Sequence, residues 1–313
     1  MCLTLLIACK YNYIGRMPVV LALVGATGIG KSRLSLELAK RFDAQIVGVD
    51  SRQIYKGFAI GTAQPSAADM ESVRHHLVNF VNPECAYSAG DFCRDAKAVI
   101  NASPEQNFIL VGGTGMYLQS LLLGLPQIPR IAPEIREQLQ QSAEQDNGVS
   151  LYEQAQKADP ESMANVERNN VQRIVRILEV FLGTGRKLSE WQKERVGGIG
   201  KVPTFWLTRN RENLYARIDA RVDQMMRDGW MEEIHELAKR VPLEAPAWQS
   251  LGYRELLAAN SSAAVARVLD DVKRKTRNYA KRQLTWFRWQ MECTQVDLET
   301  VDNPFEFVCN FLK

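Results

Sequence analysis

The 313-residue sequence fits one large domain or two. Hydrophobic residues make up 46% and charged residues 24%, a balance that excludes a disordered chain and can form a buried core. No apolar run approaches the roughly 18 residues of a membrane span, so we expect no membrane partner. Six cysteines occur without a C-x-x-C pair, which indicates free thiols in a reducing, cytoplasmic compartment and no zinc site.

The net charge of +3 is concentrated in one segment. Residues 271–290 hold seven Lys or Arg against one Asp, so the other 293 residues together carry −3. Four aromatic residues, Tyr279, Trp286, Phe287 and Trp289, lie between these cations, as in segments that bind nucleic acid. Taken alone, such a run is more often a solvated basic helix whose aromatic rings pack on the core. Both interpretations stay open at this point.

The chain begins with an apolar stretch, "LTLLIAC", that resembles the tail of a signal peptide. It lacks a preceding basic residue and is too short for a normal signal-peptide core. We therefore expect residues 1–16 to be a ragged, dispensable extension, with Met17 as an alternative start.

Three apolar runs predict buried strands in an α/β core. "VVLALVG" (19–25) precedes a glycine turn and the helically spaced "SRLSLELAKRF" (32–42). "AQIVGVD" (44–50) is the second strand, and "NFILVGG" (107–113) is the third, which feeds another glycine turn and helix. Strands that alternate with helices favour a parallel sheet covered on both faces.

The pattern changes after Leu125, where the proline-rich "PQIPRIAP" (126–133) begins. Up to about residue 200 only helical patterns occur, of which "NVQRIVRILEVFL" (170–182) has the clearest apolar stripe. "VPTFWLT" (202–208) then predicts a strand that returns to the sheet, followed by a mostly helical C-terminal part. We expect residues 129–200 to be a helical insertion domain in a core formed by 17–128 and 201–313.

The string "GATGIGKS" (25–32) fits G-x-x-x-x-G-K-[ST], between a predicted strand and a predicted helix. In this P-loop, glycines turn consecutive backbone N–H groups inward, and the helix directs its positive end at an anion. The motif predicts a polyphosphate or pyrophosphate site without establishing ATP as the ligand. Lys31 would reach the distal phosphate oxygens and the Ser32 hydroxyl would bind Mg²⁺. The predicted diphosphate-binding residues here are Gly25, Ala26, Thr27, Gly28, Ile29, Gly30, Lys31 and Ser32.

Asp50 closes the second predicted strand. The carboxyl ends of neighbouring parallel strands share a crevice, so this carboxylate should lie near the P-loop. The Asp50 carboxylate could cap a turn, support a metal-bound water or act as a general base. Its position alone favours the first two roles.

Six further strings accompany the P-loop, namely "VDSRQIYKGFAIGTAQP" (49–65), "HHLVNFVNPECAYSAGDF" (75–92), "LVGGTGMYLQSLLLGL" (110–125), "NNVQRIVRILEVF" (169–181), "LGYRELL" (251–257) and "YAKRQLTWFR" (279–288). In this order they resemble the family of tRNA dimethylallyltransferases, also called tRNA isopentenyltransferases. The match runs over residues 19–290 and includes the helical insertion. Six strings in register with a P-loop form a highly specific pattern.

The resemblance implies that the P-loop and Arg217 bind the pyrophosphate of dimethylallyl diphosphate, with Mg²⁺ as the cofactor. Asp50 is then expected to accept a proton from the N6 amine of adenine 37, beside the anticodon of tRNA, and Thr27 ranks second as a catalytic group. We expect a monomer that meets its tRNA along several segments. The implied tRNA contacts are Asp50, Ser51, Arg52, Gln53, Thr114, Arg136, Asn169, Asn170, Val171, Gln172, Arg173, Gln249, Gly252, Tyr253, Arg254, Lys281, Arg282, Trp286 and Arg288.

Four positions depart from the family pattern. The family usually has proline at Ala26, aspartate at Ala59, lysine at Gln64 and aspartate at Asn170. None of these removes a proposed catalytic group, although Asn170 loses a negative charge. The cysteines also exclude the C-terminal zinc finger that eukaryotic members often add.

Chemistry from first principles agrees with the implied roles. An allylic diphosphate ionises readily, so the enzyme has to stabilise the departing pyrophosphate, and Lys31, Ser32-bound Mg²⁺ and Arg217 supply positive charge for this. Adenine N6 is a poor nucleophile, and a positioned carboxylate that takes its proton typically contributes ~10²–10⁴-fold. The adenine must also leave its stack to enter a closed site.

Two alternatives belong to other classes. A P-loop small-molecule or nucleoside kinase would share the motif and the aspartate but transfer phosphate from ATP. A non-catalytic RNA-binding regulator would keep the P-loop as a relic. The chain length and "DSRQIY" oppose the kinase, and intact Lys31, Ser32 and Asp50 oppose the regulator.

Overall fold

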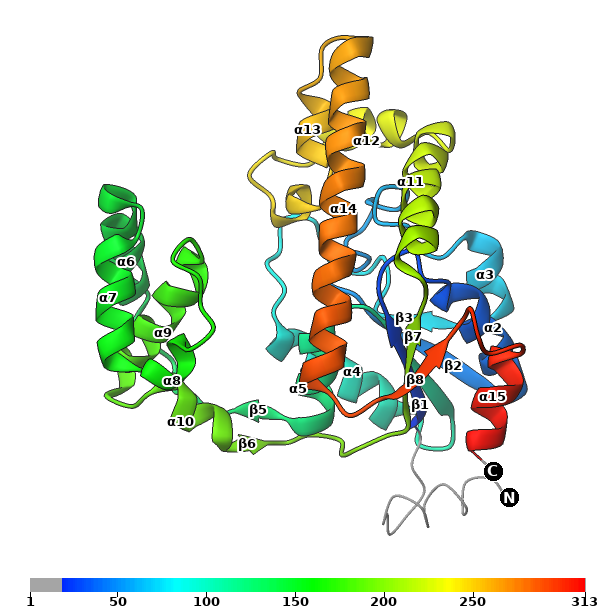
Figure 1. Cartoon of the computed structure of the whole chain (residues 1–313), viewed down its shortest axis with the longest axis horizontal. Coiled ribbons are helices and arrows are strands. Elements are labelled where there is room, and N and C mark those ends of the chain that lie inside the picture. The colour runs from blue at the N-terminus through cyan, green and yellow to red at the C-terminus, as the bar shows by residue number, and fades with distance from the viewer. Residues whose placement is uncertain (1–18, 313) are drawn as a thin grey trace. The chain divides into compact units, whose positions relative to one another are not determined.

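The computed structural model describes residues 19–312, so the predictions for residues 1–16 and Met17 lie outside the described part. Its main element is a parallel sheet of six strands in the order β3-β2-β4-β1-β7-β8 (Figure 1). The strands are β1 (Val19–Gly25), β2 (Ala44–Val49), β3 (His75–His76), β4 (Asn107–Gly112), β7 (Thr204–Thr208) and β8 (Thr294–Asp297). The predicted α/β class with a parallel sheet is confirmed.

The four longest strands, β1, β2, β4 and β7, are mostly apolar because helices cover both faces of the sheet there. Every residue of β7 is buried, as are five of the six in β2. The two-residue edge strand β3 and the late strand β8 escaped prediction, because runs this short and mixed lack a clear pattern.

The helices of the first compact unit, residues 19–122 and 200–312 of the described chain, cover the sheet and extend beyond its carboxyl edge (Figure 1). They are α2 (Lys31–Arg41), α3 (Ala67–Ser72), α4 (Ala89–Ala102), α5 (Gly115–Leu123, which ends one residue past the unit), α11 (Arg211–Arg227), α12 (Trp230–Ala238), the 3₁₀ turn η1 (Pro246–Gln249), α13 (Tyr253–Leu257), α14 (Ser262–Gln290) and α15 (Pro304–Phe311).

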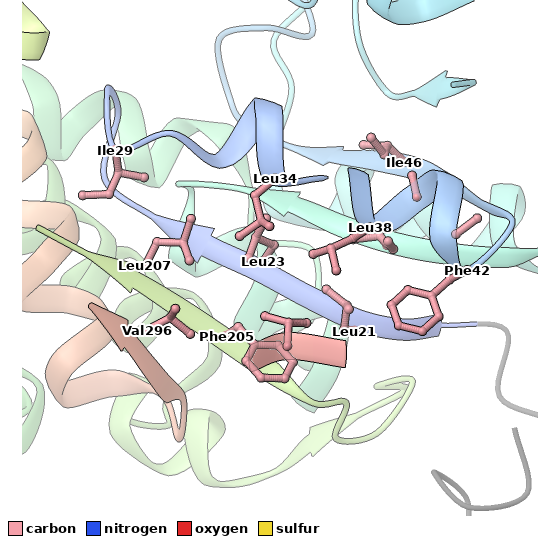
Figure 2. Packing of buried hydrophobic residues seen from close by; sticks show 14 of the residues in the cluster. Leu21, Leu23, Ile29, Leu34, Leu38, Phe42, Ile46, Phe205, Leu207 and Val296 are labelled. Carbon is pink, nitrogen blue, oxygen red and sulfur yellow. The ribbon is translucent and has the colours of Figure 1, made fainter. Parts of the chain in front are cut away.

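One apolar cluster joins the P-loop to the sheet (Figure 2). Leu21 and Leu23 of β1 pack against Leu34 and Leu38 of α2, on the spacing that predicted this helix. Ile29, inside the P-loop, is fully buried in the same cluster. The side chain of Ile29 therefore anchors the loop on the core, while loop residues line a cavity on the other side.

Helices α11 and α14 lie side by side beyond the carboxyl edge of the sheet (Figure 1). Two ion pairs connect them, Arg277–Asp219 at 2.6 Å and Lys273–Asp223 at 2.6 Å. Each pair uses half-exposed side chains, so their stabilisation is modest, about 0–1 kcal/mol each. They nonetheless fix which faces of the two helices meet.

The second compact unit is Leu123–Ile199. It contains β5 (Leu125–Pro126), α6 (Pro133–Asp146), α7 (Val149–Ala158), α8 (Pro160–Met163), α9 (Val171–Thr184), α10 (Leu188–Lys193) and β6 (Arg195–Val196). Its core includes Ile174, Val175 and Leu178 on the stripe that predicted α9. A fully buried carboxylate, Asp159, accepts hydrogen bonds from Ser189 N (2.9 Å) and Ser189 Oγ (2.7 Å) and thereby joins α8 to α10.

This unit begins six residues before the predicted insertion of 129–200 and ends one residue earlier. Gly124 explains the early start. It has φ of +88°, and a Cβ there would lie 2.3 Å from the carbonyl oxygen of Val196. Glycine thus allows β5 to pair with β6 before the prolines that marked the predicted boundary.

Candidate active site

The P-loop turns between β1 and α2 on glycines that the backbone requires. Gly28 and Gly30 have φ of +76° and +115°, in a region that L side chains rarely adopt. Ala26 and Ile29 have fully buried side chains, so of the predicted diphosphate contacts these two offer only backbone atoms. The resulting cradle of N–H groups at the start of α2 suits an anion.

Lys31 lies across this cradle. Its Nζ donates hydrogen bonds to the carbonyl oxygens of Gly25 and Ala26, both at 2.9 Å. Burial lowers the pKa of Lys31 to about 8, partly offset by the Asp50 carboxylate and reinforced by Arg221. Ser32 is exposed at the beginning of α2 and lines the same cavity.

Helix α11 brings two arginines to the loop from above. Arg217 Nε donates to the Gly28 carbonyl oxygen at 3.0 Å, and Arg221 Nη1 donates to Thr27 Oγ1 at 3.3 Å. Burial lowers the pKa of Arg221, and the Asp50 carboxylate opposes this shift. Sequence reasoning identified Arg217 and missed Arg221, although the i, i+4 spacing places both on one helix face.

Asp50 follows β2 and uses one oxygen to form a turn. Asp50 Oδ1 accepts the backbone N–H groups of Arg52 (2.8 Å) and Gln53 (3.2 Å). The capping role that its position favoured is therefore present. Both of these bonds go to Oδ1, and Asp50 lines both of the cavities described below.

The turn after β4 lies next to Asp50, since β4 separates β2 from β1 in the sheet. Thr114 N donates to the Val49 carbonyl oxygen at 3.1 Å, and Thr114 Oγ1 accepts from Ser51 N at 3.1 Å. Gly112 has no room for a side chain, because a Cβ would lie 1.9 Å from the Val49 carbonyl oxygen. Thr114 and Ser51 thus fix one another beside Asp50.

The segment after Asp50 is held by amide and carboxylate side chains. Gln53 Nε2 donates to the carbonyl oxygens of Thr62 (3.2 Å) and Ala63 (2.6 Å), and Gln64 Nε2 donates to that of Gln53 (2.9 Å). Gln64, a departure from the family pattern, therefore keeps a donor directed at this loop. Glu233 Oε2 accepts Ala59 N (2.9 Å) and Ile60 N (2.8 Å), a role that sequence reasoning missed because no motif contains it.

Two cavities meet at these residues. The larger, about 600 Å³, is lined by the P-loop, Lys31, Ser32, Asp50 and both arginines. The smaller, about 110 Å³, has an apolar wall. That wall contains Ile218, Val222, Met225, Leu251 and Val272. Four residues line both cavities: Thr27, Asp50, Thr62 and Arg221.

The basic helix α14 divides its side chains between solvent and protein. Lys281, Arg282 and Arg288 are exposed, and Trp289 is 73% exposed. Phe287 is buried in the protein, and the ring of half-buried Trp286 lies directly over Gly115. The inward rings of Trp286 and Phe287 agree with the interpretation of a solvated basic helix packed on the core, and nucleic-acid binding by the exposed cations stays a prediction.

The predicted contacts near residue 250 separate in the same way. Gln249 and Arg254 are exposed, whereas Tyr253 is fully buried and donates through its hydroxyl to Glu233 Oε1 at 2.7 Å. Gly252 has φ of +92°, and a Cβ there would lie 2.5 Å from the Trp230 ring. Gly252 and Tyr253 are thus buried and pack this segment on the protein, so they are not exposed as the predicted tRNA contacts required.

Within the second unit, the predicted contacts gather at the start of α9. Asn169, Gln172 and Arg173 are exposed there, and Val171 is half-buried. Asn170 Oδ1 caps the helix by accepting Arg173 N at 3.3 Å, a bond that an aspartate would also make. Arg136, on α6, lies 3.7 Å from the Glu179 carboxylate and keeps 44% of its side chain exposed.

A glycine turn of the P-loop type on a parallel sheet, with cations, a carboxylate and adjoining cavities at the carboxyl edge, is the architecture of a P-loop-type α/β enzyme. The model of a family described as IPP transferase matches residues 53–290. The chain belongs to this family of tRNA dimethylallyltransferases.

Relatives and solved structures agree. The chain is 38% identical over 283 residues to a tRNA dimethylallyltransferase of Fusobacterium nucleatum, covering 90% of this chain and 92% of that one. For the enzyme of Bacillus subtilis the identity is 36%, with 90% and 91% covered. The crystal structure of a tRNA isopentenylpyrophosphate transferase from Bacillus halodurans matches with a TM-score of 0.67 and 31% identity, covering 95% and 97%. A eukaryotic dimethylallyltransferase acting on tRNA matches with a TM-score of 0.77 and 27% identity, covering 93% and 77%.

Proposed function

We propose that this enzyme transfers a dimethylallyl group from dimethylallyl diphosphate to the N6 amine of adenine 37 in tRNA and releases pyrophosphate. The observation that carries this proposal is the junction of the two cavities, where Asp50, Thr27 and Arg221 face both spaces. A leaving group held on one side and a nucleophile admitted from the other would meet there.

The larger cavity would hold the diphosphate. Arg217 and Arg221 approach the P-loop from α11, and Lys31 lies at the loop from α2. The Lys31 ammonium now bonds two loop carbonyls and would turn from them to the diphosphate. Three cations and the loop N–H groups would then stabilise the negative charge that develops as the carbon–oxygen bond breaks.

Mg²⁺ is the proposed cofactor of this step, and the residues present fit it. Mg²⁺ usually keeps several waters and binds through substrate phosphates and one or two protein oxygens. Ser32 Oγ, exposed in the larger cavity, offers one such oxygen. Bound there, the ion would add positive charge beside the leaving group. Among residues 19–312, no cluster of three His, Cys, Asp or Glu offers a site built from protein ligands alone.

The smaller cavity would admit the adenine and the five-carbon chain. Its apolar wall suits both a purine face and an allyl group, and the Ser250 hydroxyl supplies a polar atom. Ser250 is 2% exposed, and within the described residues its Oγ is buried without a hydrogen-bond partner. An unsatisfied buried hydroxyl is costly, so a polar group on the ligand accounts for it better than an empty space.

Asp50 would act as the base through Oδ2. Its Oδ1 is held by two backbone N–H groups, which fixes the carboxylate plane. Oδ2 would take the N6 proton as the new C–N bond forms. Thr27 Oγ1 accepts from Arg221 and can donate its own hydrogen to the diphosphate or the base.

The tRNA would lie along the exposed cations of α14 and, in the second unit, at the start of α9. We propose a monomeric enzyme that works in the cytoplasm, where its tRNA substrate is found. Among residues 19–312 no helix is both long and apolar enough to cross a membrane. A kinase is not favoured, because the relatives and structures reported above are dimethylallyl- or isopentenyltransferases.

The direct test combines purified protein, Mg²⁺, labelled dimethylallyl diphosphate and unmodified tRNA that carries A37. Label transfer to the tRNA, lost when A37 is replaced by guanosine, supports the proposal. A parallel reaction contains ATP instead of the allylic donor. ATP consumption without label transfer would indicate a kinase, and tRNA binding without either reaction would indicate a regulator.

A further inference from the structure

Among the four buried residues of helix α14, Gln283 is the polar one. Gln283 is 6% exposed, whereas its sequence neighbours Lys281 and Arg282 are exposed. Its amide spans the two glycine turns of the active site. Gln283 Oε1 accepts the backbone N–H of Thr27 at 2.9 Å, and Gln283 Nε2 donates to the Gly113 carbonyl oxygen at 2.9 Å.

The chemistry of the two partners determines how this amide is oriented. Thr27 N can only donate and Gly113 O can only accept, so a flipped amide would place donor against donor and acceptor against acceptor. The backbone at Gly113 is shaped to admit the side chain, because a Cβ there would lie 2.2 Å from Gln283 Nε2. Gln283 therefore has one orientation and a fitted recess.

The two turns that Gln283 joins lie at the cavities and beside Asp50. Thr27 lines both cavities and accepts from Arg221. Gly113 precedes Thr114, which bonds Ser51 N beside Asp50. The β1 turn thus carries the proposed leaving-group side of the site, the β4 turn supports the segment that holds Asp50, and Gln283 bonds both turns.

We propose that Gln283 is a positioning residue, which fixes Thr27 and the Gly113–Thr114 turn relative to one another for alkyl transfer. This role for Gln283 rests on the proposed function and concerns the same site. Thr27 N donates to Gln283 Oε1, so it is not among the N–H groups left for the diphosphate. Gln283 thereby holds the Thr27 backbone at the place where the two cavities adjoin. Lys281 and Arg282 are exposed on the same helix turn whose Gln283 amide is buried.

The test compares three variants with the wild-type protein. Gln283→Met keeps the side-chain length and removes both hydrogen bonds. Gln283→Glu keeps the acceptor for Thr27 N and loses the donor to Gly113 O when ionised. Gln290→Met, an exposed position on the same helix, is the matched control.

We expect Gln283→Met to lower kcat by about 10–100-fold, because misplacement by about 1 Å can cost ~10² in rate. KM for tRNA and the binding of inorganic pyrophosphate should stay within about threefold of wild type, and Gln290→Met should match wild type throughout. The activity of Gln283→Glu relative to wild type should rise as pH falls. Protonation restores an O–H donor toward Gly113 O, whereas the relative activity of Gln283→Met should not change with pH.

Two results would overturn the inference. One is wild-type kcat in Gln283→Met. The other is a loss in Gln283→Met that is matched by a lower melting temperature and weaker tRNA binding, with no recovery of Gln283→Glu at low pH, which would make Gln283 a packing residue only. Either leaves the transferase activity of the wild-type protein intact. Failure of the wild-type protein to transfer label is a separate outcome that rejects the proposed function.

Discussion

Helices α11 and α14 are neighbours joined by ion pairs, yet their other cations meet different surroundings. Arg217 and Arg221 of α11 bond the P-loop, whereas Lys281, Arg282 and Arg288 of α14 face solvent. We propose that this difference reflects the size of the anion that each helix binds. A diphosphate fits in a cavity and is held by a few converging cations. An RNA backbone is long and is met by a row of exposed ones. Net charge marks α14 as the more basic helix, but it does not show which side chains bond a loop and which face solvent.

The largest effect is expected at Asp50, which lines both cavities. Asp50→Asn should lower kcat by about 10²–10⁴-fold, because the amide cannot accept the N6 proton. Its Oδ1 can still cap the turn, so pyrophosphate binding, measured by calorimetry, should stay within about threefold. Ser51→Ala is the control for local disturbance. Equal losses of turnover and pyrophosphate binding would reassign Asp50 to support of the loop or of the metal.

The inward role of α11 is tested at Arg221. Arg221→Ala should lower kcat/KM for dimethylallyl diphosphate by about 10–100-fold, in line with removal of one charged group that stabilises the leaving oxygen. Binding of tRNA, measured separately, should be unchanged. Arg227→Ala is the matched control, since Arg227 is an exposed arginine of α11 bonded to Gln224 on the same helix. If Arg221→Ala and Arg227→Ala had the same effect, Arg221 would not be the group that stabilises the leaving oxygen.

The outward role of α14 is tested at Lys281 and Arg282. Alanine at either position should weaken tRNA binding several-fold. The slope of log K against log salt should fall by about 0.7–0.9 for each tRNA phosphate that the variant no longer neutralises. Affinity for pyrophosphate should not change. Lys239→Ala, at an exposed lysine paired with Glu236, is the control. An unchanged salt slope would show that these cations do not meet phosphate.

The smallest effect is expected from pH. The pKa of Lys31 is lowered to about 8, so the ammonium is present below pH 8 and is lost above it. A bound diphosphate favours the charged form and raises this pKa, so binding near pH 8 should take up a proton, and affinity should fall as pH rises above 8. Calorimetry in buffers of different ionisation enthalpy measures the uptake. Subtracting the proton uptake of Lys31→Met from that of the wild-type protein removes the ligand's own titration. A difference of zero would contradict the lowered pKa of Lys31.

Much of the fold followed from local pattern. The run at 19–25 and the glycines of the P-loop predict a strand and an anion-binding turn, because apolar runs and positive φ act within a few residues. The position of Asp50 at the carboxyl end of β2 was predictable from the general geometry of parallel sheets. The stripe of α9 likewise predicted a helix with its own packed face.

The sequence by itself determined the parallel sheet, the phosphate turn and the family, since each depends on neighbouring residues or on strings in fixed order. Only the tertiary structure decided which side of a helix meets which loop. Arg221, Glu233 and Gln283 join segments that are 194, 174 and 256 positions away from them in the chain. Tyr253 lies inside rather than outside for the same reason. Such pairings depend on how whole elements pack, and no short stretch of sequence contains that information.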